Sequence, residues 1–542
     1  MSGRTCKWLV FGILAAVAVG GCKTSKEYRD ERAEYAVKHF EFARYREMME
    51  GQKLSLDACI KMAHENNLEL KVAAIEENVA KEMRTAEVLG MLPDLNISDS
   101  FTSRSNTAAS SSRKTVSDGL TYGYSSSQDR NINYFNVDLA LSVVDFGLAF
   151  FNSQQAGDRA LIRKERTRRV AQNLTFDVVK VYFQVAAAQR AIKITTTLLE
   201  DCRNREKLIK DLSAKRAITP FRAFDETKRF VEMEKRLTNY IRSYENSCVE
   251  LRALLGMHPG GQILVDDSYL NSVPKFEFPE IELMEQIALL ERPELYEVDM
   301  QKHINVVECR KEIIKLFPNV RVFYDFTNND NSFLYHNSWY ELGIRAAYNL
   351  LKMPQNIKRL QAQNAQVEAD EVRTFSMAIG IMAQVRIAHA NLLSVKERYN
   401  IDNKLYDAYS KNLKWAITSK KLTGELSSLE LDHMRLATAE TEIERLMSLG
   451  NVYVAYYRVL NCIGIKKLDA TSLNALRAEL VAARERASAE LAKAAKDHAA
   501  QRDQLTAAGK KAVEEFTMIE KPVSAFGDID FISIYDADIK KK

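Results

Sequence analysis

Two long stretches of the chain carry apolar residues at alternating steps of three and four, the spacing that lines one face of an α-helix. They run from about residue 148 to 214 and from about 355 to 420. At a rise of 1.5 Å per residue, each would extend roughly 100 Å. The two series match step for step, 207 positions apart: Leu174, Val178, Val181, Val185, Ala188 and Ile192, then Ile381, Val385, Ala388, Leu392, Val395 and Tyr399.

Four shorter stretches alternate strictly between apolar and polar residues, which is the pattern of a β-strand with one apolar and one polar face. Leu95 and Ile97, for example, alternate with Asn96 and Ser98. The four stretches form two pairs. The segment between the two stretches of each pair is polar and is predicted to be a loop, and the first of these loops is predicted to be flexible. We predict strands at about 94–101, 136–145, 319–326 and 340–349, with the loops at 102–133 and 327–338.

Breaker and capping residues set the ends of the flanking helices. One helix is predicted from about 54 to Pro93 and another from about 280 to Pro318, because proline ends a helix. Asp145-Phe146-Gly147 is expected to close the second strand and open the first long helix. Thr219-Pro220 then begins a return helix to about 255, and a turn at Thr423-Gly424 leads into a second return helix to about 460.

The order helix, strand, loop, strand, long helix, turn, helix therefore occurs twice, which favours an internal duplication over two unrelated coiled-coil arms. We assign the first repeat to residues 51–260, the linker to 261–279 and the second repeat to 280–465. Residues 466–542 have no counterpart in the first half. Their content of Ala, Glu, Lys and Arg predicts a C-terminal helical extension, either packed on the outside or partly disordered.

The N-terminus has the pattern of a secretory signal, in which basic residues precede an apolar run that ends in Val19-Gly20-Gly21. Small residues directly before Cys22 resemble a bacterial lipobox. We therefore expect residues 1–21 to be removed, the Cys22 thiol to carry lipid, and residues 22–50 to form a tether. The alternative is an ordinary signal or short anchor with an incidental cysteine. No later apolar run approaches the ~20 residues that a membrane helix requires.

The composition gives no support to several other classes of function. The 542 residues are 28% charged and 46% hydrophobic, with a net charge of +4 and no basic patch interleaved with aromatics, so nothing points to nucleic acid. Beyond Cys6 and Cys22, five scattered cysteines form no disulfide framework and are expected to be buried. The eight histidines have no metal-binding spacing, and there is no phosphate-binding glycine loop. We expect no catalytic residues, no cofactor and no metal.

The strand count bears on how a pore would close. Secretion, alternating strands and polar loops indicate an outer-membrane barrel. Four strands cannot close a barrel, for which roughly eight is the minimum, so several chains must share one. Two chains would supply eight strands and three would supply twelve. Aromatics near the loop ends suit an interfacial girdle or, alternatively, the core of a soluble sandwich: Tyr122, Tyr124, Tyr134, Phe135, Phe333, Tyr335, Trp339 and Tyr340.

Short motifs recur in a fixed order along both repeats. They are Asn66-Asn67-Leu68-Glu69-Leu70, Leu92-Pro93-Asp94-Leu95, Val144-Asp145-Phe146-Gly147 and the Val-Tyr-Phe-Gln run at Tyr182, followed by Arg292-Pro293-Glu294-Leu295, Phe317-Pro318-Asn319-Val320, Leu422-Thr423-Gly424 and Leu429-Glu430. In this order the chain resembles the TolC-like outer-membrane efflux family, in its lipidated branch, over about residues 50 to 464. It departs from the family pattern at residues 348–354, where another turn leads into the second long helix.

The resemblance implies a homotrimer that is mainly α-helical, with a twelve-stranded membrane β-barrel joined to a twelve-helix periplasmic α-barrel. It implies an outer-membrane channel that passively receives substrates from a periplasmic adaptor protein and an inner-membrane transporter. The chain would be lipid-anchored and inserted in the outer membrane, with a long periplasmic part. The alternative function is a periplasmic coiled-coil adaptor or structural scaffold lipoprotein, which would need no strand-loop-strand inserts.

The resemblance also marks the two helix–helix turns farthest from the membrane. Thr219, Pro220, Thr423 and Gly424 lie in these turns and are predicted to dock the adaptor. Glu430 is the candidate for an acidic ring at the periplasmic aperture, with Asp432 and Asp225 behind it, and such a ring attracts cations. Glu430 also ends a capping-box pattern, which needs this residue for backbone hydrogen bonds, so both roles stay open.

Overall fold

The computed structural model describes part of the chain, in two compact units, Met1–Lys467 and Leu468–Lys542. Within the second unit, residues 471–489 form a helix. The predicted signal segment, Cys22, Gly424 and most of the predicted C-terminal extension lie outside the described residues. Those residues are 24–45, 53–111, 123–273, 278–423, 428–465 and 471–489.

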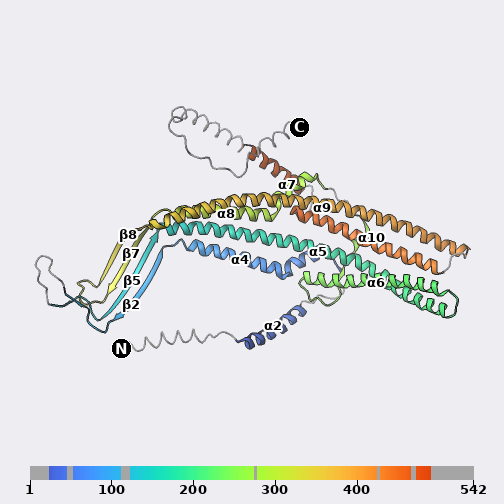
Figure 1. Ribbon diagram of the computed structural model, residues 1–542, viewed down its shortest axis with the longest axis horizontal. Coiled ribbons are helices and arrows are strands. Elements are labelled where there is room, and N and C mark those ends of the chain that lie inside the picture. The colour runs from blue at the N-terminus through green and yellow to red at the C-terminus, as the bar shows by residue number, and fades with distance from the viewer. Residues whose placement is uncertain are drawn as a thin grey trace, which may run out of the picture. The chain divides into compact units, whose positions relative to one another are not determined.

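Two helices of exceptional length dominate the first unit (Figure 1). They are α5, Val143–Ala214 with 72 residues, and α9, Met353–Thr423 with 71 residues. Each packs along a return helix, α6 (Pro220–Leu254) for α5 and α10 (Ser428–Ile463) for α9. A shorter helix, α2 (Ser25–Tyr45), precedes both repeats, and the 3-10 turn η2 (Leu350–Lys352) leads into α9.

The start of α5 corrects one prediction. Asp145-Phe146-Gly147 does not close the strand, because the helix already begins at Val143 and these residues belong to its first turn. The side-chain oxygen of Ser142 accepts a hydrogen bond from the Asp145 N–H at 3.3 Å and caps the helix. The sequence pattern placed the boundary about three residues too late, because Val143 continues the apolar alternation of the strand.

The helix ahead of each strand pair is interrupted, whereas one helix was predicted. The first repeat has α3 (Leu56–Asn66) and α4 (Leu68–Leu89), and the second has α7 (Ile281–Glu291) and α8 (Pro293–Ile314). Asn67 and Arg292 are both extended, with ψ of 127° and 124°. The proline after Arg292 explains the second break, since the residue before proline avoids helical angles. In the first break, the Asn67 side chain accepts from the Leu70 N–H at 3.0 Å and caps α4.

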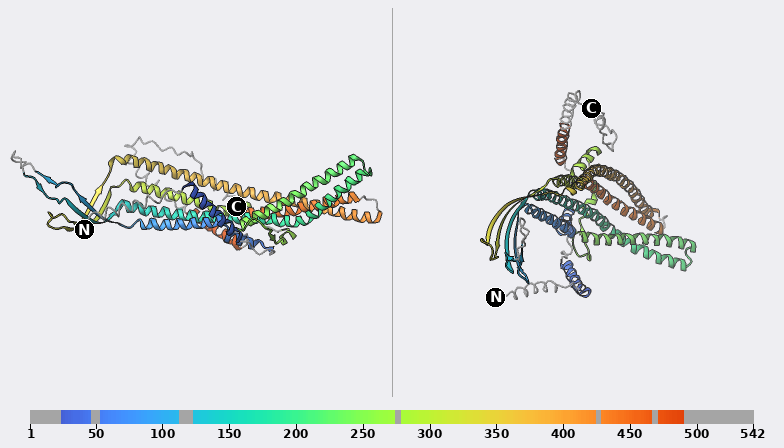
Figure 2. Two further views of the ribbon diagram at one scale, coloured as in Figure 1. Left: turned by 90° about the horizontal axis from the view of Figure 1, so that it is seen from below. Right: turned by 60° about the vertical axis from the view of Figure 1, so that its left-hand side comes forward.

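Four strands form one antiparallel sheet in the order β2-β5-β7-β8 (Figure 2). The two repeats meet at β5 and β7, and β2 and β8 are the edges. The predicted start of β5 was about five residues too late, because Asn131 and Asn133 are polar and continue the composition of the loop. The strands are β2 Asp94–Ser103, β5 Asn131–Ser142, β7 Asn319–Asn329 and β8 Ser338–Ala347, with a small pair β3 Ala109–Ser110 and β4 Ser125–Ser126 inside the first loop.

The linker between the repeats contributes to the main core. Its strand β6 (Leu264–Val265) pairs in parallel with β1 (Lys53–Leu54), followed by the 3-10 turn η1 (Ser268–Asn271). Tyr182 of α5 is fully buried beneath this pair and donates to the Asp266 carbonyl at 2.7 Å. Phe183 stacks on Tyr453 of α10 with ring centroids 4.5 Å apart. The core therefore joins both repeats and the linker at the middle of the long helices.

The five described cysteines are free and buried, as predicted: Cys59, Cys202, Cys248, Cys309 and Cys462. Burial raises the pKa of Cys59 to about 12 and that of Cys202 to about 11. Reactive cysteines are thiolates at neutral pH. These two side chains therefore behave as small hydrophobic groups.

One described helix, Leu350–Lys421, is long and apolar enough to cross a membrane by length and composition alone. This differs from the expectation that no apolar run after the signal segment approaches that length. The cause is that α9 is apolar on two sides. Ile381 and Val385 are buried against the rest of the chain, whereas Ile379 and Ile387 on the opposite side are exposed.

Each repeat ends at a glycine with positive φ. Gly256 and Gly464 follow the return helices with φ of +70° and +89°. A Cβ on Gly256 would lie 2.7 Å from the carbonyl oxygen of Asn66, and one on Gly464 would lie 3.2 Å from that of Glu291. Each glycine thus lets the end of a return helix approach the break in the preceding helix of its own repeat.

We predict that Gly256→Ala destabilises the helical part by about 1–3 kcal/mol, because alanine is strained at positive φ and its Cβ collides with backbone. The measurement is the urea midpoint of the full chain in detergent, followed by far-UV circular dichroism. Gly380→Ala is the matched control. It lies within α9 with nothing within 4 Å of the added Cβ, so the midpoint should hold or rise. Equal loss in both variants would contradict the steric argument.

Candidate channel site

The four-stranded sheet has one apolar and one polar face. Its apolar residues remain largely exposed in the single chain, with Leu342 and Ile344 each 74% exposed. The residues of the apolar face are Leu95, Ile97, Phe101, Val137, Leu139, Leu141, Val322, Tyr324, Phe326, Leu342 and Ile344. An apolar sheet face of this extent requires a cover of lipid or protein.

The polar face carries a row of three acidic residues and one asparagine across the sheet. Asn96, Asp138, Asp325 and Glu341 lie directly opposite one another on successive strands. Opposed carboxylates repel one another, and the Arg321 guanidinium forms an ion pair with Asp138 that offsets part of this repulsion. This charge pattern suits a face in contact with water.

The loops at the far end of the sheet are tied together by polar contacts between the repeats. The Asp129 carboxylate accepts from the backbone N–H of Ser332 at 2.5 Å and from its hydroxyl at 2.9 Å. Asp330 accepts from the Asn133 N–H at 2.5 Å, and Asn331 donates to the Ser127 carbonyl at 2.9 Å. Tyr134, Trp339 and Tyr340, three of the predicted girdle aromatics, lie near this end and are exposed; Tyr122 lies outside the described residues.

The outer edges of β2 and β8 have no strand partner within the described chain. Both strands are ten residues long, and each leaves a row of backbone N–H and C=O groups open. Ten residues is also the length that a tilted strand needs to cross a bilayer. The sheet is therefore an open fragment whose edges can pair with further strands.

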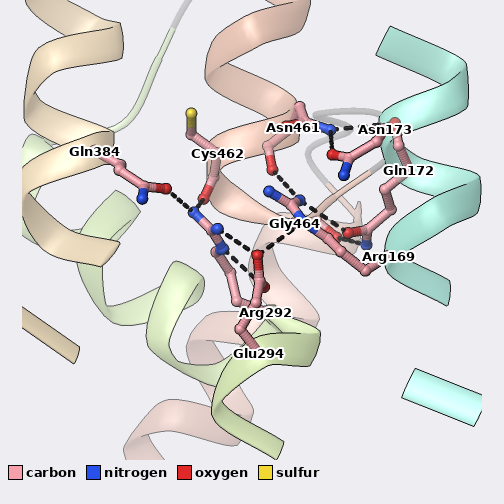
Figure 3. A network of polar contacts seen from close by, with 9 residues as sticks. All are labelled: Arg169, Gln172, Asn173, Arg292, Glu294, Gln384, Asn461, Cys462 and Gly464. Carbon is pink, nitrogen blue, oxygen red and sulfur yellow. Dashed lines mark hydrogen bonds and ion pairs between the residues drawn. The ribbon is translucent and has the colours of Figure 1, made fainter. Parts of the chain in front are cut away.

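A buried polar junction connects the end of α10 to α5, α8 and α9 (Figure 3). Arg292, only 3% exposed, donates through two nitrogens to the Glu294 carboxylate at 2.6 and 3.1 Å. Its third nitrogen donates to Gln384 at 2.8 Å and to the Cys462 carbonyl at 3.3 Å. From α5, Arg169 pairs with Glu294 at 2.8 Å. One guanidinium thus holds three helices at the break between α7 and α8.

Electrostatics favours the charged form of this junction. Burial by itself raises the pKa of Glu294, but the hydrogen bonds from Arg292 and the charges of Arg169 and Arg292 outweigh it, and the pKa lies below its usual range. The pKa of Arg169 is also lowered, because the effect of burial outweighs the attraction of the Glu294 carboxylate. The carboxylate is thus ionised between two cations at neutral pH.

The first repeat has a simpler version of the same junction. The Asn67 side chain donates to the Leu254 carbonyl at 3.3 Å, just as Arg292 donates to the Cys462 carbonyl at 3.3 Å. Each acceptor stands two residues before the capping glycine of its return helix. The two motifs found in the sequence, Asn66-Asn67 and Arg292-Pro293, are therefore structural equivalents that tie a return helix to a helix break.

The predicted tip residues lie at the end of the helices opposite the sheet (Figure 1). The Thr219 side chain accepts from the Arg222 N–H at 3.3 Å and caps α6, and Pro220 is its first residue. Thr423 is the last residue of α9. These positions fit turns, and their predicted role in docking stays a prediction.

The predicted aperture acids occupy separate places. Asp225 on α6 pairs with Arg229 at 3.0 Å, and Asp432 on α10 pairs with Arg205 of α5 at 2.5 Å. Glu430 is exposed in the first turn of α10. Each aspartate thus has an arginine beside it, and the ring of acids stays a prediction about an assembly.

Sequence patterns missed a partly buried pair at the tip. His433 Nε2 lies 2.5 Å from the Glu226 carboxylate, and its ring stacks on Phe230 with centroids 5.0 Å apart. The pair joins α10 to α6. The two residues are 207 positions apart in the sequence and are brought together only by the tertiary fold. The periodicity of a single helix therefore could not predict this contact.

Two apolar stripes lie on the outside of the helical part without a partner in the described chain. Each stripe follows helical spacing, and every member is at least half exposed. The stripe on α4 is Leu68, Val72, Ile75, Val79 and Met83, and that on α9 is Val372, Phe375, Ile379, Ile387, Leu393 and Ile401. Apolar stripes of this kind are typical of helix surfaces that pack against another helix.

Among the described residues, no group of three His, Cys, Asp or Glu side chains could hold a metal ion. The polar contacts above join structural elements.

Residues 59–257 match the family described as outer membrane efflux protein. No curated protein sequence matches the chain. Among solved structures the chain is similar to CusC, with 14% identity and a TM-score of 0.60 over 76% of this chain and 92% of that one. It is similar to the outer-membrane channel MtrE of Neisseria gonorrhoeae, with 17% identity and a TM-score of 0.60 over 76% and 89%.

A further similar structure is the Campylobacter jejuni outer-membrane channel CmeC, with 12% identity and a TM-score of 0.59 over 77% of this chain and 88% of that one. At these identities the likeness shows the fold. The predicted fold class, mainly α-helical with a duplicated strand part, is confirmed, as is the resemblance to the TolC-like family.

We predict that Arg292→Met destabilises the chain by about 3 kcal/mol, because the buried carbonyl of Cys462 loses this donor and the Glu294 carboxylate keeps only its pair with Arg169. The exposed Arg203–Glu234 pair at 2.8 Å supplies the control, Arg203→Met, which should cost less than about 1 kcal/mol. Urea midpoints of both variants test this. A junction variant as stable as the control would show that Arg292 is not a structural tie.

Proposed function

We propose that this chain, which has the fold of the TolC-like channels and matches their family over its first repeat, is the outer-membrane channel of a tripartite export system. The observation that carries the proposal is the open four-stranded sheet. It has one apolar face, one polar face and two unpaired edges, and it continues directly into helices of about 70 residues. A membrane pore with a long periplasmic stem uses all of these features.

The open edges argue for a shared barrel. No backbone N–H or C=O can be left unpaired in hydrocarbon, so β2 of one copy must pair with β8 of the next. The apolar face then contacts lipid, and the row at Asp138, Asp325 and Glu341 lines water. Three copies supply twelve strands, the number that the family resemblance implies, and we propose a homotrimer.

The helical part supports the same assembly. The stripes on α4 and α9 are exposed in one copy, and a ring of copies would bury them against neighbouring helices. The return helices α6 and α10 add two more helices per chain. Three copies would then enclose a periplasmic tunnel continuous with the barrel, through which substrates pass passively.

Lipidation at Cys22 would add a second attachment to the outer membrane beside the barrel. Its support is the small-residue pattern before the cysteine and the charged helix α2 that follows. A diacylglycerol on the Cys22 thiol would carry two acyl chains, which suffice for stable anchoring, so the lipid would hold the chain at the membrane before the barrel inserts.

The proposed partners are a periplasmic adaptor and an inner-membrane transporter, which would meet the tips at Thr219, Pro220, Thr423 and Gly424. Passive conduction requires no catalytic group in this chain. Glu430, with Asp432 and Asp225, would set the charge at the aperture. A periplasmic scaffold would have no function for a sheet whose apolar face is long enough to cross a bilayer.

Surface labelling of intact cells tests the proposal. Thr102→Cys and Asn329→Cys, at the loop end of the sheet, should react with a membrane-impermeant maleimide, while Ala217→Cys at the opposite tip should react only after the outer membrane is permeabilised. The described native cysteines are buried, so the background should be low. Labelling of Ala217→Cys but not of Thr102→Cys on intact cells would reject a barrel in the outer membrane.

We predict that Ile75→Asp breaks the assembly, because the substitution places a carboxylate in each copy at a helix interface that would otherwise be apolar. Native mass spectrometry in detergent should show a shift from trimers towards monomers. Glu69→Lys, on the flank of the same helix, is the control and should leave the trimer intact. A trimer that survives Ile75→Asp would show that the α4 stripe is not the contact.

A further inference from the structure

The turn between α5 and α6 contains a strained arginine. Arg216 has φ of +58° and is the one described residue other than glycine with positive φ. The backbone closes α5 there, with the Arg216 N–H donating to the Ser213 carbonyl at 3.0 Å and the Ala217 N–H to the Leu212 carbonyl at 2.9 Å. Glycine usually holds this position because it carries no Cβ. Backbone strain that is retained in a turn is typical of a residue whose side chain has a function.

Two aromatic side chains lie beside this arginine without cover. Phe221 is 83% exposed and Phe224 is 70% exposed, one turn apart on the same face of α6. Phe224 also lines a groove of about 450 Å³ between the ends of α5 and α6, with Ile209, Lys210, Ser213, Ala214, Ala223 and Thr227. Exposed phenylalanines beside a groove are typical anchors for a partner.

The same tip is basic. Residues 205–229 contain eight Lys or Arg and four Asp or Glu, a net charge of +4 that equals that of the whole chain. Three of the four acids already face cationic or histidine partners, since Asp225 pairs with Arg229, Glu206 pairs with Lys210 and Glu226 contacts His433. Lys215, Arg216 and Arg222 flank Phe221 in the sequence and give this turn a surplus of positive charge.

We propose that the α5–α6 tip docks an acidic α-helical segment of the periplasmic partner, with Phe221 and Phe224 as apolar anchors and Lys215, Arg216 and Arg222 facing its carboxylates. The proposal rests on the proposed function, since it specifies the partner's chemistry. A groove between two antiparallel helix ends accepts a helix, whereas a membrane surface is flat. A second copy's tip would bring the same positive charge and be repelled.

The test uses the full chain in detergent and two synthetic helical hairpins as probes. One presents leucines flanked by glutamates, and the other has the glutamates replaced by lysines. Fluorescence anisotropy at low salt should show binding of the acidic hairpin only. Phe221→Ala combined with Phe224→Ala should weaken it at least about tenfold. Val249→Ala, an exposed apolar position on the same helix away from the tip, should bind like the wild type.

Arg216→Gly separates docking from stability. Removing the strain should raise the urea midpoint, while losing the guanidinium should weaken binding of the acidic hairpin. A stabilised variant with unchanged affinity would overturn the role given to Arg216. Equal binding of both hairpins, or binding of phosphatidylglycerol vesicles in place of the acidic hairpin, would overturn the proposed partner.

The remaining outcomes separate this inference from the proposed function. If the double phenylalanine variant loses its trimer, a second copy covers these side chains and the docking proposal fails. If hairpin binding is unaffected by every tip variant while Thr102→Cys is still labelled on cells, the docking proposal fails alone. Loss of the Thr102→Cys label in the unmodified background would instead reject the channel.

Discussion

The structure depends on one requirement of the backbone. Every N–H and C=O group within hydrocarbon must be hydrogen-bonded, and a sheet of four strands leaves two edges that are not. In this chain those edges belong to β2 and β8, from different repeats, so the duplicated chain supplies an open four-stranded fragment. In the barrel that we propose, copies join at these edges, the apolar face contacts lipid and the acidic row on the polar face contacts water.

The position of the sheet also constrains the helical part. The long helices begin directly at the strands, with Ser142 capping α5, so the position of the sheet fixes where each helix starts. At the middle, the break residues Asn67 and Arg292 hold the ends of the return helices in equivalent ways. The two repeats thus share the same backbone geometry at this break but use different side chains. The first repeat has a neutral amide, and the second has a buried guanidinium.

Much of this was predictable because it repeats along the chain. Strand alternation and helical spacing are local, and both gave the right elements. The misplaced boundaries arose where local signals conflict. Val143 continues a strand pattern within a helix, and Asn131 and Asn133 are loop-type residues within a strand. Asn67 interrupts a helix without a proline. The Glu226–His433 pair and the Arg292 junction could not be predicted, because they join residues that only the tertiary fold brings together.

Single-channel recording in planar lipid bilayers, on protein whose copy number is fixed beforehand by native mass spectrometry, tests the central claim most directly. The account predicts that a folded assembly of three copies inserts and gives discrete conductance steps, and that a folded monomer gives none. Steps from a folded monomer, or a folded three-copy assembly that inserts without conducting, would contradict it.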